Sequence, residues 1–333
     1  MIGLINTSSP GKIILFGEHA VVYDKLGIAS TINLRARVSA KIGNPIVISK
    51  NFNHRWDYSE SELQQLLSTF EKLKEQKKFD EIKKLNSKEI PIKFILAKIF
   101  DKYDYKPINV EMFSEIKKGL GSSSSIFSAI ILAICNLLDK NISKEKISRL
   151  TYEGDVIAHG GTPSGIDNNV VTFGGYIKYK KSEGFEKLKI SSKISLIIVD
   201  SGRPSTTAET VMHVRKLGEK KPNFVSQILE KISDMSLNAA EALRKGDREE
   251  LGKLMTQNHE LLKQLGVSTP ELNKLVNLAL KNNAYGAKLT GSGGGGCIIA
   301  STENQEKLKN MFIKNGYKAF ITKLGVEGVR VES

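Results

Sequence analysis

A glycine- and serine-rich segment, GLGSSSS at 119–125, has the composition of a phosphate-binding loop. Its glycines allow the backbone to approach a ligand, and the apolar run that follows it, at 126–138, predicts a buried helix whose first amides attract anions. Serine hydroxyls there can donate to phosphate oxygens or bind Mg²⁺, which prefers oxygen ligands. The segment lacks the Gly-Lys-Ser/Thr of a P-loop. The alternative is a serine-capped helix that follows a glycine turn.

Asp155 is the first carboxylate that could act beside this loop. It falls near the end of a helix predicted from about 143 to 158, where a negative charge opposes the helix dipole at a cost of about 0.3 to 1 kcal/mol. Such a placement favours a counter-cation, and Mg²⁺ is the natural candidate. Glu153 could equally be the inward-facing residue, and an exposed carboxylate is the simpler alternative.

Asp167 is the second carboxylate, and it follows a turn-forming run at 160–165. We expect a strand from 170 to 179 after it, so a rigid scaffold could aim its side chain into a cleft. There it could accept the proton of a substrate hydroxyl or orient that hydroxyl. The alternative is a side chain that caps the turn.

A third segment, PGKIILFGEHAVVY at 10–23, carries Lys12, Glu18 and His19. Lys12 precedes an apolar strand, and its ammonium would stabilise the negative charge of phosphoryl transfer if it pointed into the same cleft. A single histidine such as His19 is more often structural. A second glycine run, at 291 and 293–296, permits close packing against a ligand or loop, or forms a flexible turn.

The elements that position these residues are strands mixed with helices. Strands are predicted at 12–16, 28–42, 45–48, 108–113, 170–179 and 194–199 and near the C-terminus, and helices at 60–85, 91–100, 126–138, 143–158, 224–244, 248–265, 270–282 and 305–315. This order fits an α+β sandwich better than a doubly wound sheet. The polar stretch at 180–189 predicts two domains, at 1–184 and 185–333.

Composition narrows the class of protein further. Fifty Lys and Arg against 36 Asp and Glu give a net charge of +14, which favours anionic partners without choosing among nucleotide, nucleic acid and membrane surface. The lysines are spread along the chain, which indicates a solvated surface. Cys135 and Cys297 lack metal-type spacing and are expected as buried thiols. With no secretion signal and no apolar run of membrane length, a soluble, cytoplasmic protein is expected.

Taken together, three of these segments resemble the ordered signature motifs of the GHMP kinases, named for galacto-, homoserine, mevalonate and phosphomevalonate kinases. They are PGKIILFGEHAVVY at 10–23, GLGSSSS at 119–125 and KLTGSGGGGC at 288–297. The GEHAVVY form, with HGGTPSGID at 159–167 and LLKQLGVSTPEL at 261–272, is similar to the mevalonate kinases in particular.

This resemblance implies a fold and a reaction. The fold is an N-terminal domain of ribosomal-S5-like topology and a C-terminal ferredoxin-like domain, with ATP and substrate bound between them. The reaction is transfer of the γ-phosphoryl group of ATP, with Mg²⁺, to the 5-hydroxyl of mevalonate. The partners implied are these small molecules, with no nucleic acid and no membrane, and the chain is expected as a monomer or homodimer.

The resemblance also assigns roles to individual residues. Lys12 matches the motif lysine near the substrate and the transferred phosphate, and Asp167 matches the catalytic aspartate. Glu18 and His19 match residues of the active-site wall, and Thr207 falls where the family has a threonine close to the substrate. These five residues are the expected substrate contacts.

The expected nucleotide and metal contacts follow from the same comparison of motifs. The phosphate cradle corresponds to Lys117, Gly119, Leu120, Gly121, Ser122, Ser123 and Ser124. Ser123 takes the place of the Mg²⁺-ligating serine. Asp155 takes the place of a glutamate in many relatives and is one methylene shorter. The segment at 159–167 is also one residue longer than the common HGNPSG form.

Three other functions remain alternatives. The nearest is another GHMP kinase, for phosphomevalonate, homoserine or a sugar. A second is a non-catalytic protein that keeps the fold, against which the presence of Lys12, Ser123 and Asp167 argues. The third is nucleic-acid binding, which charge alone suggests and no recognised motif supports.

Overall fold

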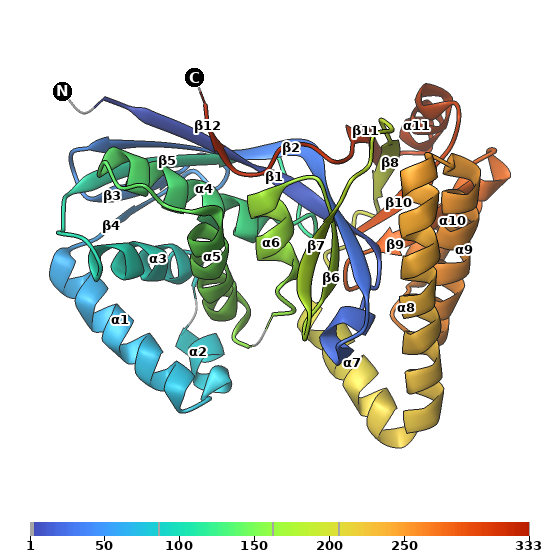
Figure 1. Ribbon diagram of the computed structural model, residues 1–333, viewed down its shortest axis with the longest axis horizontal. Coiled ribbons are helices and arrows are strands. Elements are labelled where there is room, and N and C mark those ends of the chain that lie inside the picture. The colour runs from blue at the N-terminus through green and yellow to red at the C-terminus, as the bar shows by residue number, and fades with distance from the viewer. Residues whose placement is uncertain (1–2, 86, 162, 206, 333) are drawn as a thin grey trace.

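The computed structural model describes residues 3–85, 87–161, 163–205 and 207–332. Its first sheet contains strands from both ends of the chain (Figure 1). The strand order is β12-β1-β2-β5-β3-β4, and the hairpin of β6 and β7 joins through β2. The strands are β1 (Ile5–Phe16), β2 (Gly27–Ile42), β3 (Ile46–Ser49), β4 (His54–Asp57), β5 (Ile108–Ser114), β6 (Tyr176–Lys180), β7 (Gly184–Leu188) and β12 (Arg330–Val331).

Helices pack against this sheet and enclose its core. They are α1 (Glu60–Glu75), α2 (Phe79–Leu85), α3 (Ile90–Phe100), α4 (Ser122–Leu137), α5 (Lys144–His159) and α6 (Ile166–Phe173). α4 contacts β1, β2, α3 and α5. Its residues Ile130, Ile131 and Ile134 are fully buried. The prediction of a helix that is apolar on all sides and lies inside a domain is therefore confirmed.

The second sheet has four antiparallel strands in the order β11-β8-β10-β9. They are β8 (Ser195–Asp200), β9 (Gly286–Thr290), β10 (Cys297–Ser301) and β11 (Lys318–Lys323). The helices of this half are α7 (Thr207–Lys220), α8 (Pro222–Lys245), α9 (Arg248–Gln264), α10 (Pro270–Lys281) and α11 (Gln305–Lys314). α9 and α10 pack on β9, and α11 packs on β8 and β11.

β1 connects the two halves of the molecule. It contacts β2 and α4 in the first half, and β9, α8 and α9 in the second. A core cluster that includes Ile13 and Leu15 of β1 also includes Ile198 of β8, Leu243 of α8 and Met255 of α9. After β1 a short 3₁₀ helix, η1 (Ala20–Tyr23), leads into β2. Residues at the end of β1 and in η1 are therefore placed at the junction of the two halves.

The structure corrects the strand predicted at 170–179. α6 occupies the first part of that segment, and β6 begins only at Tyr176. Gly174 and Gly175 separate them, with φ angles of 74° and 77° that favour glycine. Val170 and Val171 are fully buried in α6, so packing against neighbouring elements outweighs the strand preference of β-branched residues.

The chain passes from the first sheet to the second between Leu188 and Ser195, close to the domain boundary expected after residue 184. β7 still pairs with β6 in the first sheet up to Leu188, and β8 begins in the second sheet at Ser195. The C-terminal strand then returns to the first sheet, where Val331 pairs with Thr7. The division into 1–184 and 185–333 stays a prediction.

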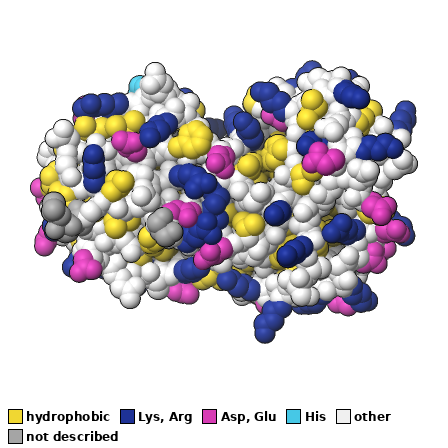
Figure 2. All heavy atoms as spheres, turned by 90° about the horizontal axis from the view of Figure 1, so that it is seen from above, with side chains coloured by type: hydrophobic (Ala, Val, Ile, Leu, Met, Phe, Trp, Pro, Cys, Tyr) yellow, Lys and Arg dark blue, Asp and Glu magenta, His cyan; other side chains and the backbone are white. Residues whose placement is uncertain are grey.

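One face of the molecule can be compared with the predicted spread of charge. On the face shown in Figure 2, basic side chains lie among acidic ones across both halves of the molecule. Within the described ranges, no helix combines the length and the apolar character that crossing a membrane requires.

Candidate active site

The glycine-serine loop begins α4 and is attached to β1. The amide of Lys12 donates to the carbonyl oxygen of Leu120 at 2.8 Å. Gly119 and Gly121 have φ angles of 90° and 82°, which favour glycine. A Cβ added to Gly121 would lie 2.6 Å from Cγ of Lys12. The absence of a side chain at Gly121 therefore lets the lysine pass directly over the start of the helix.

Lys12 and Asp167 meet at this loop. Nζ of Lys12 lies 2.9 Å from Oδ1 of Asp167. The lysine side chain is 7% exposed and the aspartate side chain 35%, so the carboxylate borders accessible space while the ammonium is enclosed. β1 supplies the first residue and the first turn of α6 the second. The structure thus brings together the two residues on which the predicted chemistry depends.

Asp155 lies in the same cluster but in the interior. Oγ of Ser124 donates to both of its carboxylate oxygens, at 3.0 and 2.8 Å. Burial raises the pKa of Asp155 well above its ordinary value, and the negative charge of Asp167 raises it further, while Ser124 and Lys12 oppose the shift. A carboxylate in this setting is stabilised as an anion when a cation binds beside it.

The donor set fits Mg²⁺ that is bound together with a nucleotide. Asp155 and the hydroxyls of the loop offer oxygen atoms, which Mg²⁺ prefers, and this ion is usually held by one or two carboxylates plus substrate phosphates. Across the part of the chain that the structure describes, no group of three or more His, Cys, Asp or Glu side chains could hold a metal ion by itself. A cation at Asp155 would therefore depend on phosphate oxygens for part of its coordination.

Glu153, the alternative to Asp155, faces the other way. Its carboxylate lies 3.3 Å from Nζ of Lys74 and 3.2 Å from Nζ of Lys98. Residues two positions apart on a helix point about 200° apart. Glu153 therefore pairs with α1 and α3, whereas Asp155 points to the start of α4.

The serines of the loop have separate environments. Ser123, the predicted metal ligand, is exposed at the first turn of α4. Ser124 is the residue that contacts Asp155. Ser125 is buried and donates to the carbonyl oxygen of Pro10 at 2.6 Å. The sequence did not distinguish Ser123 from Ser124 as the partner of Asp155, because that contact depends on how α4 is rotated against α5.

His19 and Thr207, two of the expected substrate contacts, are linked through Ser292. Nε2 of His19 donates to the carbonyl oxygen of Ser292 at 2.9 Å, and Oγ of Ser292 donates to Oγ1 of Thr207 at 2.9 Å. Burial lowers the pKa of His19, which the bond to Ser292 opposes. Ser292 is not among the predicted site residues, although it lies inside the second glycine run.

Glu18, another of the expected substrate contacts, lies in the interior. Its side chain is fully buried and forms an ion pair with Lys288 of β9. The second glycine run itself adjoins the first, since a Cβ on Gly291 would lie 3.7 Å from the carbonyl oxygen of Gly119. Lys117, one of the expected nucleotide contacts, is exposed two residues before Gly119.

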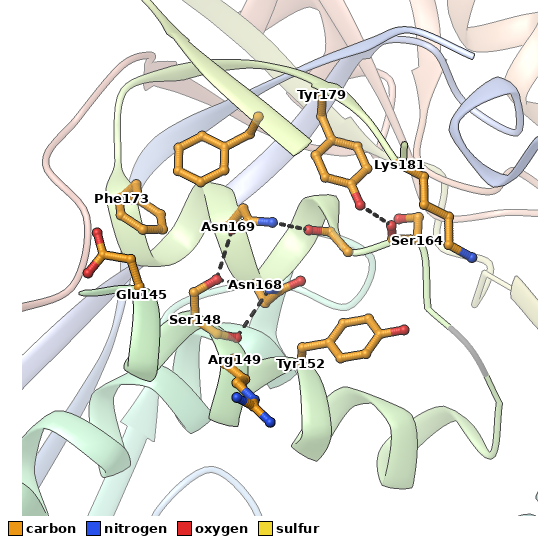
Figure 3. A pocket seen from close by; sticks show the side chains of 12 residues that line it. Glu145, Ser148, Arg149, Tyr152, Ser164, Asn168, Asn169, Phe173, Tyr179 and Lys181 are labelled. Carbon is orange, nitrogen blue, oxygen red and sulfur yellow. Dashed lines mark hydrogen bonds between the residues drawn. The ribbon is translucent and has the colours of Figure 1, made fainter. Parts of the chain in front are cut away.

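A separate cavity of about 340 Å³ lies behind α6 (Figure 3). Its walls come from α5, α6, β6, β7, the segment before α6 and the β6–β7 turn, and they include Tyr152, Phe173 and Tyr179. On its floor Nδ2 of Asn168 donates to Oγ of Ser148 at 2.9 Å. Asn168 follows Asp167 in α6, so this helix has the cavity on one side and Lys12 on another. Thr162, in the lengthened segment at 159–167, lies outside the described residues.

Comparisons with known proteins agree with these motifs. Residues 87–175 match the GHMP kinases N terminal domain, and residues 239–318 match the GHMP kinases C terminal region. A mevalonate kinase of Pyrococcus abyssi is 35% identical over 340 residues, covering 99% of this chain and 98% of that protein.

Solved structures show the same relationship. The Methanococcus jannaschii mevalonate kinase superposes with a TM-score of 0.79 and 27% identity, covering 97% of this chain and 98% of the other. A Lactococcus lactis galactokinase, at 18% identity and a TM-score of 0.74 over 98% and 95% of the two chains, shares the fold alone. The chain belongs to the GHMP kinases and, within them, to the mevalonate kinase family.

Proposed function

We propose that this protein transfers the γ-phosphoryl group of ATP to the 5-hydroxyl of mevalonate and so produces 5-phosphomevalonate. The observation that carries the proposal is the 2.9 Å pair of Lys12 and Asp167 beside the glycine-serine loop. That pair occurs in a chain whose likeness to mevalonate kinases runs through 99% of its length.

The phosphate side of the reaction is assigned to the loop and Lys12. The free amides at the start of α4 and the positive end of its dipole would hold the phosphate oxygens of ATP. The ammonium of Lys12, enclosed between β1 and Gly121, would neutralise charge on the group in transfer. Mg²⁺, held by Asp155, the Ser123 hydroxyl and the phosphates, would supply further neutralisation.

The acceptor side is assigned to Asp167 and the wall formed by His19, Ser292 and Thr207. Asp167 would receive a hydrogen bond from the 5-hydroxyl and either orient it or accept its proton. Phosphoryl transfer depends mainly on such positioning and on charge stabilisation, so both roles serve the same step.

An assay with different acceptors distinguishes this activity from those of other GHMP kinases. We would measure ADP release with ATP, Mg²⁺ and, in turn, mevalonate, phosphomevalonate, homoserine and galactose. The expected result is ADP release that depends on mevalonate and is at background with the other three. Release with a different acceptor would assign the chain to that substrate, and background rates with all four would favour a non-catalytic role.

A further inference from the structure

An ion pair at the junction of the two halves is not used by the proposed mechanism. Lys288 of β9 and Glu18, which follows β1, have fully buried side chains whose charged groups are in contact. Nζ of Lys288 also donates to the carbonyl oxygen of Leu289 at 2.8 Å. Nδ2 of Asn258 in α9 donates to the other carboxylate oxygen at 3.1 Å. These contacts therefore link the residue after β1, in the first half of the molecule, to β9 and α9 in the second half.

Stability alone is a weak explanation for this pair. Removing two charges from water is costly, and a buried ion pair can often be replaced by apolar residues of similar volume without loss of stability. Burial raises the pKa of Glu18 and lowers that of Lys288, and each group opposes the shift of the other. A pair with these properties is better explained by the geometry that it fixes.

The turn at His19 lies directly beside this pair. This residue follows Glu18 directly and has φ 62° and ψ −39°, a conformation that is unfavourable for a residue with a Cβ and persists when its surroundings hold it. The His19 ring then reaches Ser292, which reaches Thr207. Glu18, which holds Lys288, and His19, which holds Ser292, are therefore neighbouring residues of the same turn.

We propose that the Lys288–Glu18 pair is a positioning device for the acceptor side of the site. It holds the turn that presents His19 to Ser292 and Thr207. The inference rests on the proposed function, and it moves Glu18 from a substrate contact to a residue that acts through His19.

The double variant Glu18→Gln/Lys288→Met tests this inference. It removes both charges together, so no unpaired charge is left in the interior. We expect KM for mevalonate to rise at least about tenfold, because the turn at His19 relaxes. KM for ATP should stay within about twofold, because the contact of Lys12 with Leu120 is unchanged.

Lys93→Met is the matched control. Lys93 in α3 is also buried, and its Nζ pairs with Glu62 of α1 at 2.6 Å, in the helices of the first half. This variant should lower the melting temperature and leave both KM values within about twofold of wild type. Asn258→Ala is a milder companion that removes the second side-chain donor to the Glu18 carboxylate and so loosens the pair, and it should raise KM for mevalonate about threefold.

An unchanged KM for mevalonate in the folded double variant would overturn the inference, as would an equal rise for ATP. If the double variant does not fold, Asn258→Ala decides by the same two measurements. If the wild-type protein releases no ADP with mevalonate, the proposed function is wrong instead. The same variants would then be assayed with the acceptor that the wild type uses.

Discussion

One ammonium faces two carboxylates in the candidate site, and their surroundings differ. Asp167 is paired with Lys12 and partly exposed, which suits a group that meets an incoming hydroxyl. Asp155 is buried and held by Ser124, which suits a group that meets a cation. Like charges in one site disfavour ionisation of the more buried member, so binding of a cation would favour the ionised form of Asp155.

Asp167→Asn tests the role of the exposed carboxylate. The amide keeps the size of the side chain but neither accepts a proton nor balances Lys12, so we expect kcat to fall by about 10² to 10⁴. Steady-state ADP release measures this, with circular dichroism to confirm folding. Glu186→Gln, at an exposed position of β7, is the control and should retain wild-type turnover. Near-normal turnover in Asp167→Asn would contradict the assignment.

At the scale of elements, α9 and α10 fix β9 through a buried histidine. The amide of Leu289 donates to Nδ1 of His259 at 3.3 Å, and Nε2 donates to Oδ1 of Asn273 at 3.1 Å. This arrangement requires the neutral ring with its proton on Nε2. Burial lowers the pKa of His259 from 6.5 to about 4, although the bond to Asn273 opposes the shift.

His259 makes the free energy of unfolding depend on pH. Between pH 6.5 and about 4 the unfolded chain binds the proton and the native ring does not, so the free energy of unfolding falls as the pH is lowered through this window. The loss should reach at most about 3 kcal/mol. Urea unfolding of wild type and His259→Gln from pH 7 to 4.5 measures it.

His259→Gln should therefore show a flatter pH profile than the wild type. His54→Gln, at an exposed position of β4, is the control and should follow the wild-type profile. Parallel profiles for wild type and His259→Gln would show that this ring does not carry the acid sensitivity.

At the scale of the whole molecule, the two sheets share a core. The cluster around Ile13 and Leu15 contains residues of both halves, and Oγ1 of Thr290 in β9 donates to the carbonyl oxygen of Ile14 at 2.9 Å. A shared core of this kind favours unfolding as one unit, because neither half can separate without exposing buried apolar surface.

The two cysteines can report on this unit. Cys135 in α4 and Cys297 in β10 are buried, and burial raises their pKa values to about 11 and about 12. Both should be unreactive to a thiol reagent in the native protein. We expect Cys135→Ala and Cys297→Ala, which keep one thiol each, to become reactive at the same urea concentration. Earlier exposure of Cys297 would show that the second half opens by itself.

Much of the local structure was encoded in local sequence. The apolar run at 126–138 predicted α4, and the amphipathic segments at 224–244 and 248–265 predicted α8 and α9, because a helix repeats every 3.6 residues and its pattern is contained within it. Helix α7 and strands β4, β7, β9 and β10 were not predicted. β9 and β10 adjoin the glycine run at 291–296, whose composition favours a loop. The strand predicted at 170–179 was wrong in its first part, because Val170 and Val171 pack in the core as part of α6 and a local pattern does not reveal such packing.

The sequence by itself determined which segments carry the chemistry, and its motifs placed the chain in its family. Only the tertiary structure decided which side chains meet: Ser124 with Asp155, and Glu18 with Lys288 across 270 positions of the chain. The physical reason is that a motif records the residue types a reaction needs. The direction of a side chain depends on how distant elements pack, and no local pattern contains that information.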